Sequence, residues 1–190
     1  LTDANGNRFW FAYTDEVLRL SEEIGRRAGG LEYLTPHTGA GSTAKYLLQS
    51  LVEESITSSQ LEGASTSRKR AKHMLEAGLA PQDTSDRMIV NNFIAMQEVK
   101  DRARDPLTPE WVLALHRTLT AGTLSDPGES GRLQTMDDVR VSVVDQRERV
   151  THEPPPAEQL PARLEAVCEF ANGSVDDLPY LSPVIRATIT

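Results

Sequence analysis

The sequence predicts a mainly α-helical fold that carries one β-hairpin. Apolar residues recur at spacings of three and four along most of the 190 residues, which is the period of an amphipathic helix. Strict alternation is confined to one short stretch, where polar residues separate Val139, Val141 and Val143. A content of 38% hydrophobic and 25% charged residues is typical of a globular protein with a packed core.

Two helices are predicted in the first third of the chain. The first covers about 16–27, and Gly29-Gly30 is expected to end it. The second is longer and covers about 42–63, with Gly63 as its stop because glycine accepts the left-handed conformation. The apolar stripe of the second helix consists of Leu47, Leu48, Leu51, Val52 and Ile56.

Capping residues mark the next three helix starts. Ser65, Thr66 and Ser67 offer side-chain oxygens ahead of a helix over 68–77, and the stretch 83–86 can open another that runs to about residue 99. Thr108-Pro109 is a strong start, because threonine can cap a helix and proline suits its first position.

The second half of the chain begins with a turn-rich loop over 126–131, followed by a predicted hairpin over about 138–153. Pro154-Pro155-Pro156 should end the strand pairing, because proline has no backbone donor. A helix is predicted over about 161–171, and Ser182-Pro183 opens another. Because this last apolar helix begins so near the end of the sequence, we expect a longer parent chain.

Charge and composition limit the function classes. A net charge of −8 argues against nucleic-acid binding by the whole surface, because phosphates would be repelled. The lone Cys168 allows neither an intrachain disulfide nor a cysteine metal site, and we expect it to fill the core. No metal site is predicted. Without a run of about 20 apolar residues or a signal-peptide pattern, we expect a cytoplasmic protein with no membrane partner.

The helix over 42–63 carries a polar face near its end. Ser55, Ser58 or Ser59, and Glu62 are three or four residues apart and therefore share that face. A glutamate at a helix C-terminus opposes the helix dipole, at a cost of about 0.3–1 kcal/mol, which favours an external cation as its partner. From these residues alone, a solvated surface glutamate is the simpler interpretation.

The segment Ser58-Ser59-Gln60-Leu61-Glu62-Gly63 resembles the inhibitory motif of Fic-family proteins, in which Ser or Thr, three residues, Glu, and Gly or Asn follow one another. Later features are similar in order as well. They are a Leu115-His116 helix, a loop from Pro127 to Arg132, the hairpin, and a Pro-Pro segment leading into a helix. Ser130-Gly131 puts one more residue before Arg132 than the commonest form has. The resemblance covers about 15–190.

The resemblance implies a protein adenylyltransferase, which transfers AMP from ATP, with Mg²⁺, to a Ser, Thr or Tyr hydroxyl of a target protein or of itself. Residues 1–100 would form an N-terminal region with the inhibitory helix, and 101–190 the first part of the Fic core. Glu62 would be the inhibitory residue, which pairs with the arginine of the family signature. Ser58 would orient it, and Gly63 would permit the turn.

The family signature, His-Pro-Phe-x-x-Gly-Asn-Gly-Arg, does not occur in this sequence. No catalytic residue is therefore assigned, and we expect this stretch to be inactive alone. The resemblance further makes the hairpin a flap that holds a target segment by edge pairing. Val141, Ser142 and Val143 are the candidate contacts, and an exposed hairpin without that role is the alternative. A homodimer is left open.

The sequence is compatible with two other functions. Arg68-Lys69-Arg70 with Lys72 belongs to a pair of predicted helices that could form the helix-turn-helix of a DNA-binding regulator. The net charge and the lack of further basic stripes argue against it. The second is a catalytically silent Fic-like regulatory module, which the residues after Thr190 would distinguish from an enzyme.

Overall fold

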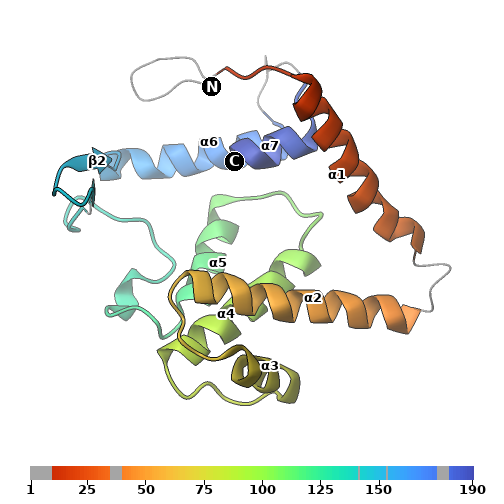
Figure 1. The fold of residues 1–190 in the computed structure, drawn as a ribbon. Coiled ribbons are helices and arrows are strands. Elements are labelled where there is room, and N and C mark those ends of the chain that lie inside the picture. The colour runs from red at the N-terminus through yellow and green to blue at the C-terminus, as the bar shows by residue number, and fades with distance from the viewer. Residues whose placement is uncertain (1–9, 35–39, 141, 153, 175–179) are drawn as a thin grey trace. The chain divides into compact units, whose positions relative to one another are not determined.

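The computed structural model describes residues 10–34, 40–140, 142–152, 154–174 and 180–190, and only the backbone of 28–34 and 40–44. In these ranges it contains seven α-helices, two short 3₁₀ helices and one two-stranded antiparallel sheet (Figure 1). The prediction of a mainly helical protein with one hairpin is confirmed. The chain divides into two compact units, Leu1–Thr43 with Asp177–Thr190, and Ala44–Asp176. No described helix is long and apolar enough to cross a membrane.

The first unit contains α1 (Asp15–Leu34) and α7 (Pro183–Ile189), which pack against each other. The prediction that Gly29-Gly30 ends the first helix is wrong, because α1 continues to Leu34. Glycine weakens a helix by about 1 kcal/mol relative to alanine, yet it keeps the N–H and C=O that the helical ladder needs. Its helix-ending effect is therefore only a preference.

The core of the second unit lies between α2 (Ala40–Leu61), α3 (Arg68–Ala77) and α4 (Thr84–Asp101). The three helices meet at one buried apolar cluster, to which the chain between α2 and α3 also contributes. Its buried members are Val52, Ile56, Ala64, Ala71, Met74 and Ile89. Ala64 belongs to this cluster, so the segment that follows α2 is anchored in the core.

The predicted helix caps are confirmed. The side chains of Ser67, Asp83 and Thr108 each accept a hydrogen bond from a backbone N–H three residues later, at the starts of α3, α4 and α5 (Pro109–Thr120). Ser182 does the same for α7, and Gly78 ends α3 with a φ of +63°. Such caps depend only on neighbours in the chain, which makes them readable from sequence.

α5 packs against α4 on one side and α6 (Leu160–Asn172) on another. Trp111 of α5 and Phe170 of α6 are buried, as is Cys168, which confirms its expected place in the core. Asn172 joins the end of α6 to the loop before α5, since its side chain bonds both the N–H and the C=O of Leu107, each at 2.8 Å. The 3₁₀ helices η1 (Pro127–Glu129) and η2 (Ala157–Gln159) lie in the connections.

The hairpin is shorter than predicted. Among the described residues of the hairpin, only β1 (Val143–Val144) and β2 (Val150–His152) pair, with Val143 opposite His152, so the strand expected from Val139 begins four residues later. Residues before Val143 would have to pair with residues after His152, where Pro154–Pro156 have no amide hydrogens. Val141 lies outside the described residues.

Two isoleucines of α4 test the position of this core. Ile89 is 0% exposed and Ile94 is 41% exposed. Ile89→Ala should lower the free energy of unfolding by about 2–5 kcal/mol, because it leaves a cavity among three helices. Ile94→Ala should lower it by less than about 1 kcal/mol. Urea unfolding followed by circular dichroism measures both, and equal losses would contradict this assignment of the core.

Candidate functional site

The turn after α2 places Glu62 at the end of a fixed backbone. Its N–H still donates to the Ser58 carbonyl at 3.1 Å, although α2 ends one residue earlier. Gly63 then takes a φ of +100°, which is strained for any residue with a side chain. The Ala64 N–H donates back to the Ser59 carbonyl at 2.9 Å. The Glu62 backbone is thus held from both sides.

The predicted polar face of α2 divides into two stripes. Ser55 and Ser59 form the first and are buried. Asn92 of α4 reaches this stripe, where its Nδ2 donates to the Ser55 carbonyl at 3.4 Å and to Ser59 Oγ at 3.3 Å. Through these two bonds, Asn92 joins α4 to the buried side of α2.

Ser58 and Glu62 form the second stripe, where Ser58 is partly buried and Glu62 faces solvent. Ser58 Oγ donates to the Glu54 carboxylate at 3.0 Å, so in this arrangement it points toward the preceding turn. Glu62 is exposed, and its carboxylate has no hydrogen bond or ion pair within the described ranges. A carboxylate on a fixed backbone is therefore available to a partner.

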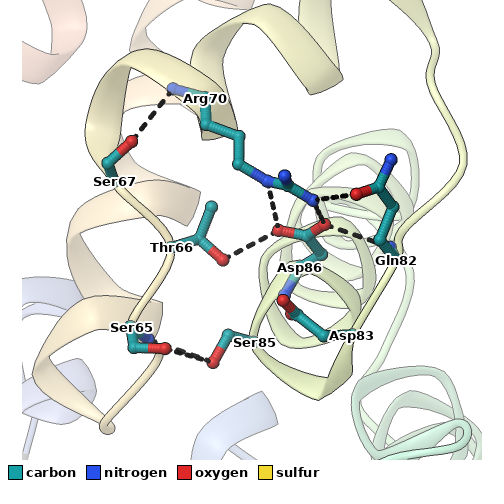
Figure 2. Close-up of polar contacts among 8 residues, drawn as sticks. All are labelled: Ser65, Thr66, Ser67, Arg70, Gln82, Asp83, Ser85 and Asp86. Carbon is teal, nitrogen blue, oxygen red and sulfur yellow. Dashed lines mark hydrogen bonds and ion pairs between the residues drawn. The ribbon is translucent and has the colours of Figure 1, made fainter.

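A buried carboxylate holds the segment that follows Gly63 (Figure 2). Asp86, in the first turn of α4, has a side chain that is 0% exposed and forms an ion pair with Arg70 of α3. Thr66 Oγ1 donates to Asp86 Oδ1 at 2.8 Å, and the Gln82 N–H donates to Oδ2 at 3.0 Å. Figure 2 shows these donors converging on the one carboxylate.

Two serines add to this junction. The N–H of Ser65 donates to Ser85 Oγ at 3.0 Å, and the two hydroxyls lie 3.1 Å apart. Ser85 is the residue before Asp86, so successive residues of the connection, Ser65 and Thr66, bond successive residues of α4 (Figure 2). The connection between α2 and α3 is consequently aligned with the start of α4.

The electrostatics of Asp86 follow from these contacts. The hydrogen bond from Arg70 is the largest influence, and together with the donors of Gln82 and Thr66 it lowers the pKa of Asp86 from an ordinary 3.8 to about 2. Burial acts in the opposite direction, because it disfavours the charged form. The contacts around Asp86 therefore stabilise its charged form.

The basic cluster over 68–72 is engaged with acidic side chains of the same chain. Arg68 and Lys72 both pair with Glu53 of α2, the lysine at 3.3 Å, and Arg70 pairs with Asp86. Three of the four cations that favoured a DNA-binding role thus have carboxylate partners. These ion pairs hold α3 against α2 and α4.

A second group of residues gathers around His116 of α5. The Gly131 N–H donates to His116 Nδ1 at 2.9 Å, so the neutral imidazole carries its proton on Nε2. Thr120 Oγ1 and Ser130 Oγ lie 2.8 Å apart and tie the same loop to α5. Gly131 is buried and has a φ of +70°. The loop 127–131 therefore depends on glycine at this point.

Arg132 organises the chain between this loop and the hairpin. Its guanidinium bonds Asp138 through two nitrogens, at 2.6 and 2.8 Å, and its Nε donates to the Gly128 carbonyl at 3.0 Å. The bond from Arg132 is the main cause that holds the pKa of Asp138 well below its usual range, and the Thr135 N–H adds to it. A bidentate pair of this kind fixes direction as well as distance.

An open cavity of about 340 Å³ lies between α5, this loop and the start of α6. Its walls mix apolar and polar side chains, which are His116, Leu124, Glu129, Arg132, Leu133, Gln134 and Leu160. The guanidinium of Arg132 already bonds Gly128 and Asp138, so in this structure Arg132 holds the wall of the cavity in place.

The hairpin presents mostly exposed side chains. Val143, Val144 and Val150 are exposed, and Ser142 is partly buried. Arg140 fastens the base of the hairpin, because its guanidinium bonds both the Gln134 side chain and the Pro155 carbonyl. Val141, the remaining predicted flap residue, lies outside the described residues.

Two predicted ligands rest on the resemblance alone. Within the described ranges, no group of His, Cys, Asp and Glu side chains could hold a metal ion. The resemblance assigns the binding of ATP and Mg²⁺ to signature residues, which are not in this sequence.

Sequence reasoning missed the structural roles of Asp86, Arg70 and Arg140. Asp86 looks like an ordinary acidic residue in a helix's first turn, and its partners lie 16 and 20 residues earlier in the chain. No local pattern could have paired them.

Comparisons with known proteins returned no relatives. The chain matches no family model, no curated protein and no solved structure.

The lowered pKa of Asp86 predicts a pH-dependent stability. A carboxylate that titrates near 2 when folded and near 3.8 when unfolded contributes about 2 kcal/mol above pH 4, and this contribution is lost as the pH falls toward 2. Urea unfolding of the wild type and of Asp86→Asn should therefore differ most near pH 6, with a gap that narrows below pH 4. A gap that stays constant from pH 6 to pH 2 would contradict the assignment.

Gly131→Ala should destabilise the second unit by about 1–3 kcal/mol. A Cβ at this position would lie 2.9 Å from the Cβ of Arg117, part of the α5 stem that cannot swing away. Gly128→Ala is the matched control, since a Cβ there meets only the movable Asp126 carboxylate, at 3.1 Å. Thermal unfolding of both variants measures the difference, and similar midpoints would count against the close packing of Gly131.

Proposed function

We propose that this chain is part of a Fic-type enzyme that transfers AMP from ATP to a hydroxyl side chain of a target protein, and that Glu62 restrains this transfer. The observation that carries the proposal is the state of Glu62. Its backbone is fixed by hydrogen bonds on both sides, and its carboxylate is exposed and without a partner among the described residues.

An inhibitory carboxylate needs both of these properties. If its backbone were loose, ordering it on every encounter would cost about 1–2 kcal/mol per residue and weaken the inhibition. If its carboxylate already had a cation within the chain, it would compete poorly for the signature arginine. The turn at Glu62, Gly63 and Ala64 satisfies the first requirement, and the exposure of Glu62 satisfies the second.

The resemblance supplies the chemistry of inhibition. Glu62 would bond the signature arginine and so displace the γ-phosphate of ATP from its productive position. Arginine binds carboxylate and phosphate by the same pair of parallel hydrogen bonds, so one group excludes the other. Each 1.4 kcal/mol of preference for Glu62 would slow transfer about tenfold.

The hairpin supports a flap for the target. Both of its strands have an unpaired edge within the described ranges, because the sheet contains only β1 and β2. An extended segment of the target can add to such an edge through main-chain hydrogen bonds, which places a hydroxyl with little dependence on sequence. Ser142 and Val143 lie at the start of this edge, and Arg140 holds its base in place.

Glu62→Gly tests the proposal in the full-length enzyme that the proposal postulates. Removal of the carboxylate should raise self-modification with labelled ATP about tenfold or more, because the arginine is released for phosphate. Glu76→Gln, an exposed carboxylate on α3, is the matched control and should leave the rate unchanged. An unchanged rate for Glu62→Gly would overturn the role of Glu62.

A further inference from the structure

The segment from Glu62 to Thr66 is tied to α4 more strongly than a surface connection requires. Ala64 is buried in the core, and Ser65 bonds Ser85 through both its N–H and its hydroxyl. Thr66 is bonded at two points, since its hydroxyl donates to Asp86 at 2.8 Å and its carbonyl accepts from Gln60 Nε2 at 2.9 Å. Every residue after Gly63 in this segment thus has a fixed partner.

The acceptor at the centre of these contacts is the buried carboxylate of Asp86, and stability alone does not require a charged group there. A fully buried carboxylate loses its hydration, and a well-packed apolar group in its place often gives equal or greater stability. Asp86 instead collects donors from three places in the chain, which are the connection at Thr66, the helix α3 at Arg70, and the residue Gln82 before α4. Such a network specifies one arrangement of these parts.

We infer that Asp86 is a positioning residue for Glu62, and that it sets the strength of the restraint by fixing the connection that follows the turn. The inference rests on the proposed function. Only three residues separate Glu62 from Thr66, and Gly63 is among them, so the turn is held in place by its anchors at either end. Loss of the Thr66 anchor would let the turn populate other conformations, in which Glu62 no longer faces its partner.

Thr66→Val is the sharpest test, because it removes one donor to Asp86 and keeps the volume and the Arg70–Asp86 ion pair. Asp86→Asn is unsuitable for this rate assay, because breaking the buried pair lowers the stability of the protein and would change the rate for that reason as well. In the full-length enzyme that the proposed function postulates, Thr66→Val should raise self-modification with labelled ATP about threefold to tenfold. Thr66→Ser retains the hydroxyl and should restore a rate near that of the wild type.

Thr66→Val in a Glu62→Gly background separates an effect that acts through the position of Glu62 from an effect of lower overall stability. With the carboxylate absent, Thr66→Val should have no further effect on the rate. Asn172→Ala removes two hydrogen bonds at the distant end of α6 and should not raise the rate in either background.

Each result has a defined meaning. An increase with Thr66→Val that disappears in the Glu62→Gly background supports the inference. If Glu62→Gly raises the rate and Thr66→Val does not, or if Asn172→Ala raises it equally, the inference is overturned and the proposed function stands. If Glu62→Gly itself has no effect, both fall.

Discussion

The ion pair between Asp86 and Arg70 is the contact on which the second unit depends. Its carboxylate is 0% exposed, so it must remain paired or bear an uncompensated buried charge, at a cost of about 3–5 kcal/mol. Through Thr66 and Gln82 the same group joins the α2–α3 connection to the chain before α4. The apolar cluster supplies stability to these three helices, whereas the ion pair fixes how they are connected.

Arg132 orders an irregular segment in the other half of the second unit. Arg132 pairs with Asp138 and also bonds the Gly128 carbonyl, so a stretch with little regular structure keeps a defined path from α5 to the hairpin. Arg140 continues this path to Pro155. In both halves, arginine orders the irregular segments, because its planar group can bond several acceptors at once.

The helices could be predicted from sequence where their causes are local. Ser67, Asp83, Thr108 and Ser182 cap the helices that they were expected to start. The hairpin was predicted too long, because alternation in one strand says nothing about whether its partner has amide hydrogens. At the candidate site, the spacing of Ser58 and Glu62 was visible in the sequence, whereas Asp86 was not, since its role arises only when distant segments meet.

The three prolines after β2 have one more consequence. An exposed valine hairpin with open edges is the kind of surface on which further copies of a chain stack into aggregated sheets. Within the described residues, three residues of one strand pair with two of the other, and the prolines at 154–156 have no amide hydrogens to donate. The run Pro154–Pro156 therefore limits the length of strand edge at which copies of the chain could pair, which opposes the growth of intermolecular β-sheets.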